Sequence, residues 1–256
     1  MGIYKRIYKT LNGTGIGNHV FVEKLREAVV YIITRAPLRT NGYLLQLDKR
    51  DSLGFLVSSN FEPEITKLIS KDSKGIGLDL GANIGYYSLL MASKGCDKVY
   101  AFEPASYNFN ILKKNIAINH LADKIIAENK AVSNKSGTAL FNLNRFSSTS
   151  NSFVHQGSAQ ENTEKVETIT LDEYFKNKEK PYIIKMDVEG WEKEAIEGGT
   201  SVFHSAKIII FENNIGLLNK RKMDPHVVLS MFKKMGFNLR KIEGEAIDNY
   251  IAIKKM

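Results

Sequence analysis

The chain has 256 residues, of which 43% are hydrophobic, and a formal net charge of +8. This length can bury one sizeable core. No apolar run reaches the roughly 18 residues that a membrane span needs, and the N-terminus lacks the apolar stretch of a signal peptide. The single cysteine, Cys96, excludes an internal disulfide framework and suits a reducing compartment, so we expect a cytoplasmic protein.

The basic residues are spread along the chain, and none of them forms the block of like charges that is typical of a nucleic-acid-binding arm. Nucleic acid, an anionic membrane or an acidic substrate could each attract such a charge. Lysine-rich surfaces serve mostly for solubility, and we favour that interpretation.

Residues 1–74 stand apart from the rest of the chain. Their pattern predicts an amphipathic helix over 20–36, a hairpin over 42–58 and a second helix over 62–71. We expect an N-terminal extension of helices and a hairpin, followed by one catalytic domain over 75–256.

From residue 75 on, short apolar segments alternate with amphipathic ones. The predicted strands cover 75–80, 98–103, 124–132, 182–187 and 206–212, and the predicted helices 85–95, 105–120 and 223–236. Strands without a polar face are buried on both faces, as in a parallel sheet covered by helices. Residues 237–243 and 248–255 read as a closing antiparallel pair. The fold class is therefore α/β, with a doubly wound sheet.

Helix 223–236 has clear end signals, with Asp224 as N-cap, Pro225 at the first position and Gly236 just past the end. Between the strands over 124–132 and 182–187 lies an insertion. Asp172 is expected to cap a short helix there. The polar loop 144–165 is expected to be a mobile cover over the substrate site, because it has too few apolar anchors to stay rigid.

The segment GLDLGANIGYYSLL joins the first of these strands to a helix through a glycine turn. Asp79, Gly81 and Gly85 form the pattern D-x-G-x-x-x-G, whereas a dinucleotide turn needs G-x-G-x-x-G. An aspartate here favours a ligand with positive charge, while the helix N-terminus still accepts a carboxylate. S-adenosylmethionine carries both. Glu103, 24 residues after Asp79, is placed to hold ribose hydroxyls. Alternatively, Asp79 caps the loop and Glu103 is an exposed strand end.

Six segments of the chain resemble the FkbM-type S-adenosylmethionine-dependent methyltransferases. These segments are LDLGANIGYYSL, YAFEPASYNFNILKKNIAIN, ENKAVSNKSGTALFNL, ITLDEYF, IIKMDVEGWEKEAIEGG and IIIFE. The resemblance implies the class I methyltransferase fold, with a Rossmann-like, mostly parallel seven-stranded sheet and an antiparallel last strand. It also implies O-methylation of a sugar, polyketide or similar metabolite. Asp79, Gly81, Asn83 and Gly85 would surround the amino-acid end of the cofactor, Glu103 would hold the ribose, and Ala131 would face the adenine.

Acidic residues at the ends of the later strands are the candidates for catalysis. Asp187, Glu212 and Asn213 converge on the carboxyl edge of the sheet, where a hydroxyl nucleophile profits from a base, and Glu189 is a further catalytic candidate. Asp187, Glu212 and Asn213 could instead hold Mg²⁺, which prefers oxygen ligands. As structural alternatives, Asp187 caps the helix that begins near Gly190, and Asn213 is a turn residue.

Other residues nearby have open roles. One of Glu189 and Glu192 is expected to face the pocket, Trp191 either stacks on a sugar or packs in the core, and His155 is either a base or a surface residue. We expect a glycan or small-molecule hydroxyl as the acceptor. The alternatives are an RNA methyltransferase, against which the absence of an N-P-P-[YF] motif counts, and a non-catalytic binding module.

Overall fold

A computed structural model of the chain describes residues 36–48, 61–143, 152–153, 162–243 and 248–254. Apart from Ala36, the predicted helix over 20–36 lies outside these residues. So do His155 and most of the polar loop 144–165. No helix in the described part of the chain is long and apolar enough to cross a membrane.

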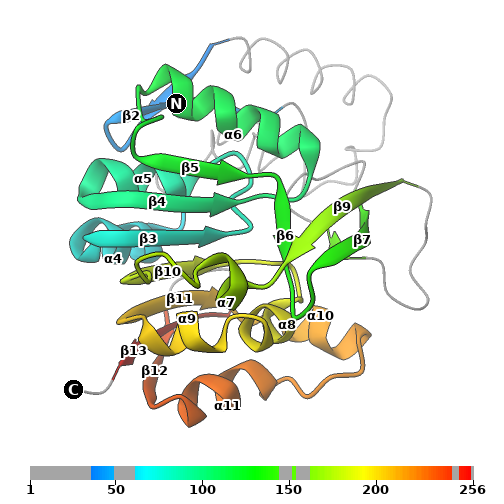
Figure 1. Ribbon diagram of the computed structural model, residues 1–256. Coiled ribbons are helices and arrows are strands. Elements are labelled where there is room, and N and C mark those ends of the chain that lie inside the picture. The colour runs from blue at the N-terminus through cyan, green and yellow to red at the C-terminus, as the bar shows by residue number, and fades with distance from the viewer. Residues whose placement is uncertain (1–35, 49–60, 144–151, 154–161, 244–247, 255–256) are drawn as a thin grey trace, which may run out of the picture.

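A seven-stranded sheet forms the centre of the molecule (Figure 1). Its strands are β3 (Gly75–Leu80), β4 (Cys96–Phe102), β5 (Ile125–Glu128), β10 (Ile183–Met186), β11 (Ile208–Glu212), β12 (Phe237–Ile242) and β13 (Asn249–Lys254). Their order is β12-β13-β11-β10-β3-β4-β5, and β13 pairs antiparallel with both of its neighbours. The remaining pairs are parallel. The predicted doubly wound, mostly parallel sheet with an antiparallel last strand is confirmed.

Helices cover both faces of this sheet, because the strands are apolar on both sides. One face packs against α4 (Pro63–Asp72), α5 (Tyr86–Lys94) and α6 (Ser106–Ile118). The other packs against α7 (Leu171–Tyr174), α8 (Glu192–Glu197), α9 (Thr200–Ser205) and α11 (Val227–Lys234). Leu78 and Leu89, one on each side, are fully buried. Each such side chain contributes about 1.5–3 kcal/mol to folding.

A short hairpin of β1 (Leu38–Thr40) and β2 (Tyr43–Leu45) precedes α4. Asn41 and Gly42 have φ of 47° and 93°, the left-handed conformation that an Asn-Gly hairpin turn requires. Of the hairpin predicted over 42–58, residues 49–58 lie outside the described residues, and its first strand, β2, pairs with β1. Leu45 and the α4 residues Ile65 and Ile69 share a core cluster with α5. The domain division at residue 74 stays a prediction.

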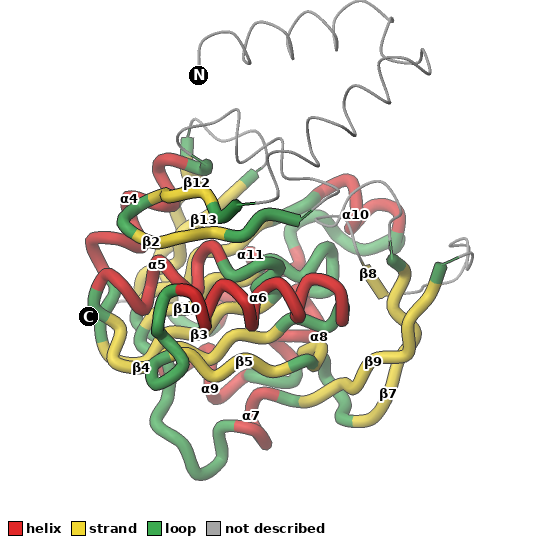
Figure 2. Tube along the Cα trace, turned by 90° about the horizontal axis from the view of Figure 1, so that it is seen from above, coloured by secondary structure: helices red, strands yellow, loops and turns green. Residues whose placement is uncertain are grey.

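A second, four-stranded sheet lies beside the carboxyl ends of β3, β4 and β5, and Figures 1 and 2 both place its β7 and β9 at that end. Its strands, in order, are β6 (Lys130–Val132), β9 (Thr163–Ile169), β7 (Gly137–Asn142) and β8 (Ser152–Phe153). The single strand predicted over 124–132 is wrong. Asn129 interrupts it, because its Nδ2 donates to the carbonyls of Glu103 and Pro104 at 2.9 Å each. The chain therefore changes sheets between β5 and β6.

Two capping predictions need correction. Asp172 does not cap its own helix α7; its carboxylate accepts N–H groups of Ser201 and Val202, at 3.1 and 3.0 Å, in the first turn of α9. Asp224 accepts the N–H of His226 at 2.8 Å, and α11 begins only at Val227. Gly236, by contrast, follows the end of α11 with φ of 84°, as predicted.

Candidate functional site at the carboxyl edge of the sheet

Asp79 lies near the end of β3 with only 2% of its surface exposed. Ser88 of α5 donates a hydrogen bond to Asp79 Oδ2 at 2.5 Å, which ties the strand to the helix. Burial raises the pKa of Asp79 to about 6, although the Ser88 hydrogen bond opposes the shift. A buried carboxylate thus stands at the glycine turn.

Two glycines of the turn are required by close packing. Gly81 has φ of 78°, and a Cβ there would lie 1.8 Å from the carbonyl oxygen of Asp187. Gly85 has φ of 94°, and its Cβ would lie 2.5 Å from Leu112 Cδ1 of α6. Gly81 therefore lets the loops after β3 and β10 touch, and Gly85 lets α5 start against α6.

Glu103 follows β4 directly and is 5% exposed, so it is not an exposed strand end. Its carboxylate accepts the N–H of Asn83 at 2.8 Å and that of Ala105 at 2.9 Å. Burial raises the pKa of Glu103 to about 7, with these two hydrogen bonds opposing it. The side-chain oxygen of Asn83 is buried and accepts no hydrogen bond within the described residues. The predicted cofactor residues of β3 and β4 are therefore brought together.

Ala131 lies in β6, on the second sheet, and is 3% exposed. It packs in a small cluster with Ala105, Phe141 and Val166, against which Trp191 also lies. Its predicted contact with adenine stays a prediction.

Three carboxylates gather at the ends of β10 and β11. Burial, and after it the charge of Asp187, raises the pKa of Glu189 to about 9 and that of Glu212 to about 8. These shared causes place Asp187, Glu189 and Glu212 near one another. Both causes favour the protonated forms of Glu189 and Glu212. We call these three residues the acidic rim.

The backbone between the two strands is strained at the acidic rim. The N–H of Trp191 donates to the carbonyl of Val188 at 3.2 Å, and the two residues between them, Glu189 and Gly190, have φ of 52° and 86°. Positive φ at both central positions is the pattern of a type I′ turn. A glutamate in this conformation costs about 1–3 kcal/mol, a strain that is commonest at functional sites.

Glu192 and Trp191 hold this turn from outside. Glu192 is 1% exposed and accepts the N–H of Gly190 at 3.1 Å. The Trp191 ring lies 3.9 Å from the guanidinium carbon of Arg221, and its Nε1 donates to Ser133 Oγ at 3.3 Å. Glu192 also lies near the acidic rim, since burial first and then the charge of Asp187 raise its pKa to about 7, and its Oε2 is buried without a hydrogen-bond partner in the described residues. Both Glu189 and Glu192 are therefore close to Asp187.

Lys185 is a site residue that our sequence reasoning missed. Its side chain is 1% exposed, and Nζ lies 3.3 Å from Asp187 Oδ2. Burial would lower the pKa of Lys185, but Asp187 foremost, then Glu62 and Glu212, raise it. The only sequence signal is a lysine inside the apolar run YIIKM, where a strand buried on both faces has no room for an unpaired charge.

The predicted magnesium site at Asp187, Glu212 and Asn213 stays a prediction, because Asn213 Oδ1, the atom that would bind the ion, is buried without a hydrogen-bond partner in the described residues. The Asn213 amide donates to the carbonyl of Pro225 at 3.1 Å, and Glu212 accepts a hydrogen bond from Asn214 at 2.9 Å. Across the residues that the structure describes, no group of three or more His, Cys, Asp or Glu side chains could hold a metal ion.

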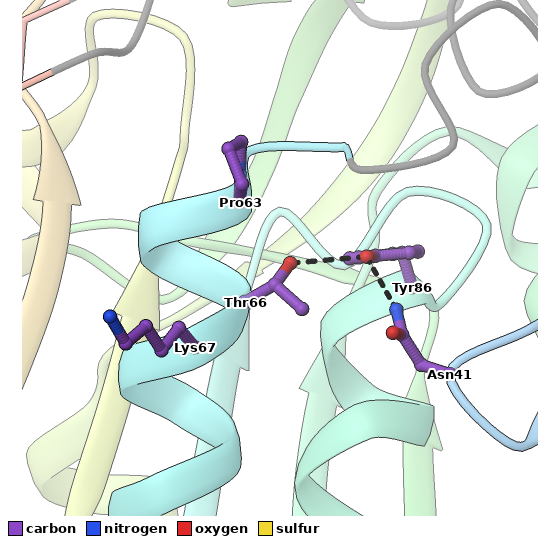
Figure 3. A pocket seen from close by; sticks show the side chains of 5 residues that line it. All are labelled: Asn41, Pro63, Thr66, Lys67 and Tyr86. Carbon is purple, nitrogen blue, oxygen red and sulfur yellow. Dashed lines mark hydrogen bonds between the residues drawn. The ribbon is translucent and has the colours of Figure 1, made fainter.

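A pocket lined by Asn41, Pro63, Thr66, Lys67 and Tyr86 lies at the start of α5 (Figure 3). Asn41 and Thr66 point toward the Tyr86 hydroxyl and hydrogen-bond to it at 2.8 and 3.1 Å, whereas Lys67 points away. These bonds tie α5 to α4 and to the β1–β2 turn. These contacts therefore fix the N-terminal end of α5, which directly follows the glycine turn.

The chain matches a methyltransferase family model and is similar in sequence to two methyltransferases. Residues 79–239 match the model of the Methyltransferase FkbM domain. The chain is similar to the hexuronic acid methyltransferase AglP of Haloferax volcanii, with 28% identity over 160 residues, 61% of this chain and 64% of the relative. It is also similar to the methyltransferase sdnD of Sordaria araneosa, with 32% identity over 85 residues, 33% of each chain.

Among solved structures, the methyltransferase FkbM from Methylobacillus flagellatus aligns with a TM-score of 0.49 and 15% identity. That alignment covers 71% of this chain and 44% of the other. The matches thus span less than two thirds of the length of each of these relatives.

Proposed function

Because the chain belongs to the Methyltransferase FkbM domain family, we propose that it is an S-adenosylmethionine-dependent O-methyltransferase. Its acceptor would be a hydroxyl group of a sugar, a glycan or a related metabolite. The similarity to a hexuronic acid methyltransferase supports a carbohydrate acceptor. The observation that carries the proposal is the acidic rim, which stands at the ends of β10 and β11 and touches the glycine turn through Gly81 and Asp187.

The residues around the glycine turn fit this cofactor. Asn83 Oδ1 is buried and has no hydrogen-bond partner in the described part of the chain. Buried acceptors without partners need donors, and the ammonium and hydroxyl groups of S-adenosylmethionine supply them. Asp79 and Glu103 add buried negative charge beside the same turn. These residues would hold the amino-acid and ribose parts of the cofactor.

When bound, S-adenosylmethionine supplies a methyl group that is already activated by its sulfonium. The protein then has to orient the acceptor and take up its hydroxyl proton. Asp187 is suited to that task, because its side chain is 30% exposed at the edge of the sheet, within reach of an acceptor, while Lys185 fixes its Oδ2 from within the sheet. Burial and the charge of Asp187 favour the protonated forms of Glu189 and Glu212, and a protonated carboxyl group can donate a hydrogen bond to another oxygen of the acceptor. A positioned base contributes about 10²–10⁴-fold to the rate.

Asp187→Asn tests the proposal, because it keeps the volume of the side chain and removes the proton acceptor. We expect kcat to fall by at least about a hundredfold, with the melting temperature and the cofactor Kd little changed. Asp248→Asn is the matched control, since Asp248 forms a surface ion pair with Lys241 at 2.7 Å. Wild-type turnover by Asp187→Asn would remove Asp187 from the mechanism.

The acceptor class is tested by offering hexuronic acids, neutral sugars and RNA with labelled S-adenosylmethionine. We expect methylation of the sugars and a rate that depends little on salt. Methylation of RNA alone, with the steep salt dependence of phosphate binding, would contradict the proposed acceptor.

A further inference from the structure

Lys185 has an unusual position for a lysine. It lies on β10, the central strand of the sheet, and its register partner on β3 is Asp79. Ile183 and Ile210, on the same face, are both 7% exposed or less, and Lys185 itself is 1% exposed. An ammonium group removed from water is costly unless it is paired, so its partners determine what it does there.

The partners of Lys185 connect two parts of the site. Its Nζ lies 3.3 Å from Asp187 Oδ2 and 5.3 Å from the centroid of the Tyr87 ring, where a cation–π contact holds it. The Tyr87 hydroxyl in turn donates to the carboxylate of Glu62. Asp79, at the glycine turn, stands beside Lys185 on the neighbouring strand. The ammonium group therefore lies between the turn and the acidic rim.

Asp187 depends on this contact for its orientation. Asp187 follows the last residue of β10, and its Oδ1 is buried without a hydrogen-bond partner in the described residues. The ion pair to Lys185 at Oδ2 is therefore the side-chain contact of Asp187 that the structure records. Without it, the carboxylate could rotate away from the rim, and its charge would face Glu189 and Glu212 uncompensated.

We propose that Lys185 is a positioning residue of the reaction site, whose buried ammonium group holds the Asp187 carboxylate at the rim in the orientation that meets the acceptor hydroxyl. The inference rests on the proposed role of Asp187. Lys185 acts through Asp187, and it does not touch the acceptor. A lysine that served only as a counter-charge for the fold would affect stability, and its loss would affect turnover whether or not Asp187 were present.

A double-mutant cycle separates these two roles. Lys185→Met keeps the length of the side chain and removes its charge, and it is combined with Asp187→Asn. We expect Lys185→Met alone to lower kcat by at least about tenfold, with less than about a threefold change in cofactor Kd. In the Asp187→Asn background, the same substitution should change kcat by less than about twofold, because its effect is already lost.

The outcomes are distinct. Losses of kcat that multiply in the double variant would overturn the positioning role, even if Asp187→Asn alone is strongly impaired. Wild-type kcat in Asp187→Asn would instead refute the proposed base, and the positioning role with it. If Lys185→Met does not fold, Lys185→Gln, which is uncharged but keeps an amide donor, enters the same cycle under the same criterion. Lys193→Met is the matched control, because Lys193 forms an exposed ion pair with Glu197 on α8.

Discussion

Gly81 and Asp187 touch through their backbones: a Cβ atom at Gly81 would lie 1.8 Å from the carbonyl oxygen of Asp187. The loops that follow β3 and β10 are therefore in direct contact, although more than a hundred residues separate them in the chain. The turn proposed to hold the cofactor and the carboxylate proposed to take the proton cannot move independently.

Gly81→Ala should disrupt this contact. The new methyl group clashes with backbone and adds strain at a φ of 78°, so we expect a loss of at least about 3 kcal/mol in unfolding free energy, together with weakened cofactor binding. Gly236→Ala is the matched control, because Gly236 has φ of 84° and no atom within 4 Å of its Cβ position. It should cost only about 1 kcal/mol and leave binding unchanged. Urea unfolding and calorimetry measure both, and equal losses would contradict the proposed clash.

Stability should fall as the pH rises above the ordinary range of carboxylates. Glu189 and Glu212 have their pKa raised from 4.5 to about 9 and about 8, so between these values the folded state binds more protons than the unfolded state. Their contribution is complete below pH 4.5 and is lost as the pH rises toward 9.

Glu189→Gln and Glu212→Gln should each flatten the fall in unfolding free energy between about pH 5 and 8, because glutamine is neutral in both states. Glu197→Gln is the control, since Glu197 is exposed and Lys193 lowers its pKa. Urea unfolding of the ligand-free protein across this range measures the slope. A slope unchanged by both of the first two substitutions would show that neither carboxyl group is protonated in the folded state.

Cofactor binding should depend on Glu103. Glutamine at this position keeps only one acceptor oxygen for the N–H groups of Asn83 and Ala105, which now share the carboxylate. We expect Glu103→Gln to weaken S-adenosylmethionine binding by about 1.5–3 kcal/mol in isothermal titration. Asp97→Asn, at an exposed position of β4, should bind like the wild type. Undiminished affinity in Glu103→Gln would mean that the turn does not need this carboxylate.

Chelation should leave the reaction intact. Lys185 already pairs with the charge of Asp187, and burial together with that charge raises the pKa of Glu212, which favours its protonated form over the carboxylate that a metal needs. We therefore expect EDTA to change kcat by less than about twofold, because a direct base needs no metal. Activity that disappears with EDTA and returns with Mg²⁺ would restore Asp187, Glu212 and Asn213 as metal ligands.

The main sheet could be predicted because the apolar composition of its strands indicates that both of their faces are buried. Residues 208–211, for example, are apolar on both sides, and only a strand covered on both faces needs that. The strand break at Asn129 could not be predicted, since it depends on hydrogen bonds to carbonyls 25 and 26 residues away in the chain. The cap by Asp172 likewise acts on a helix about 30 residues further along.

The site was predictable in its position and less so in its detail. Acidic residues after successive parallel strands must share one edge of the sheet, so Asp187 and Glu212 could be placed together. The left-handed conformation of Glu189 has no local signal, because glutamate rarely adopts it. Lys185 was missed because it lies inside an apolar run, where the sequence alone does not show that its ammonium group pairs with Asp187, two residues further along.

The pairing of Gly77 with Ile183, between β3 and β10, also bears on how the chain folds as it is made. On the ribosome, β3 emerges long before β10, and at about 5–20 residues per second the interval is on the order of ten seconds. During that time one edge of β3 has no strand beside it, while β4 can already pair with the other. A nascent chain that stalls within the insertion would therefore expose an apolar, unpaired strand, which is the kind of surface that chaperones bind and that aggregates form on.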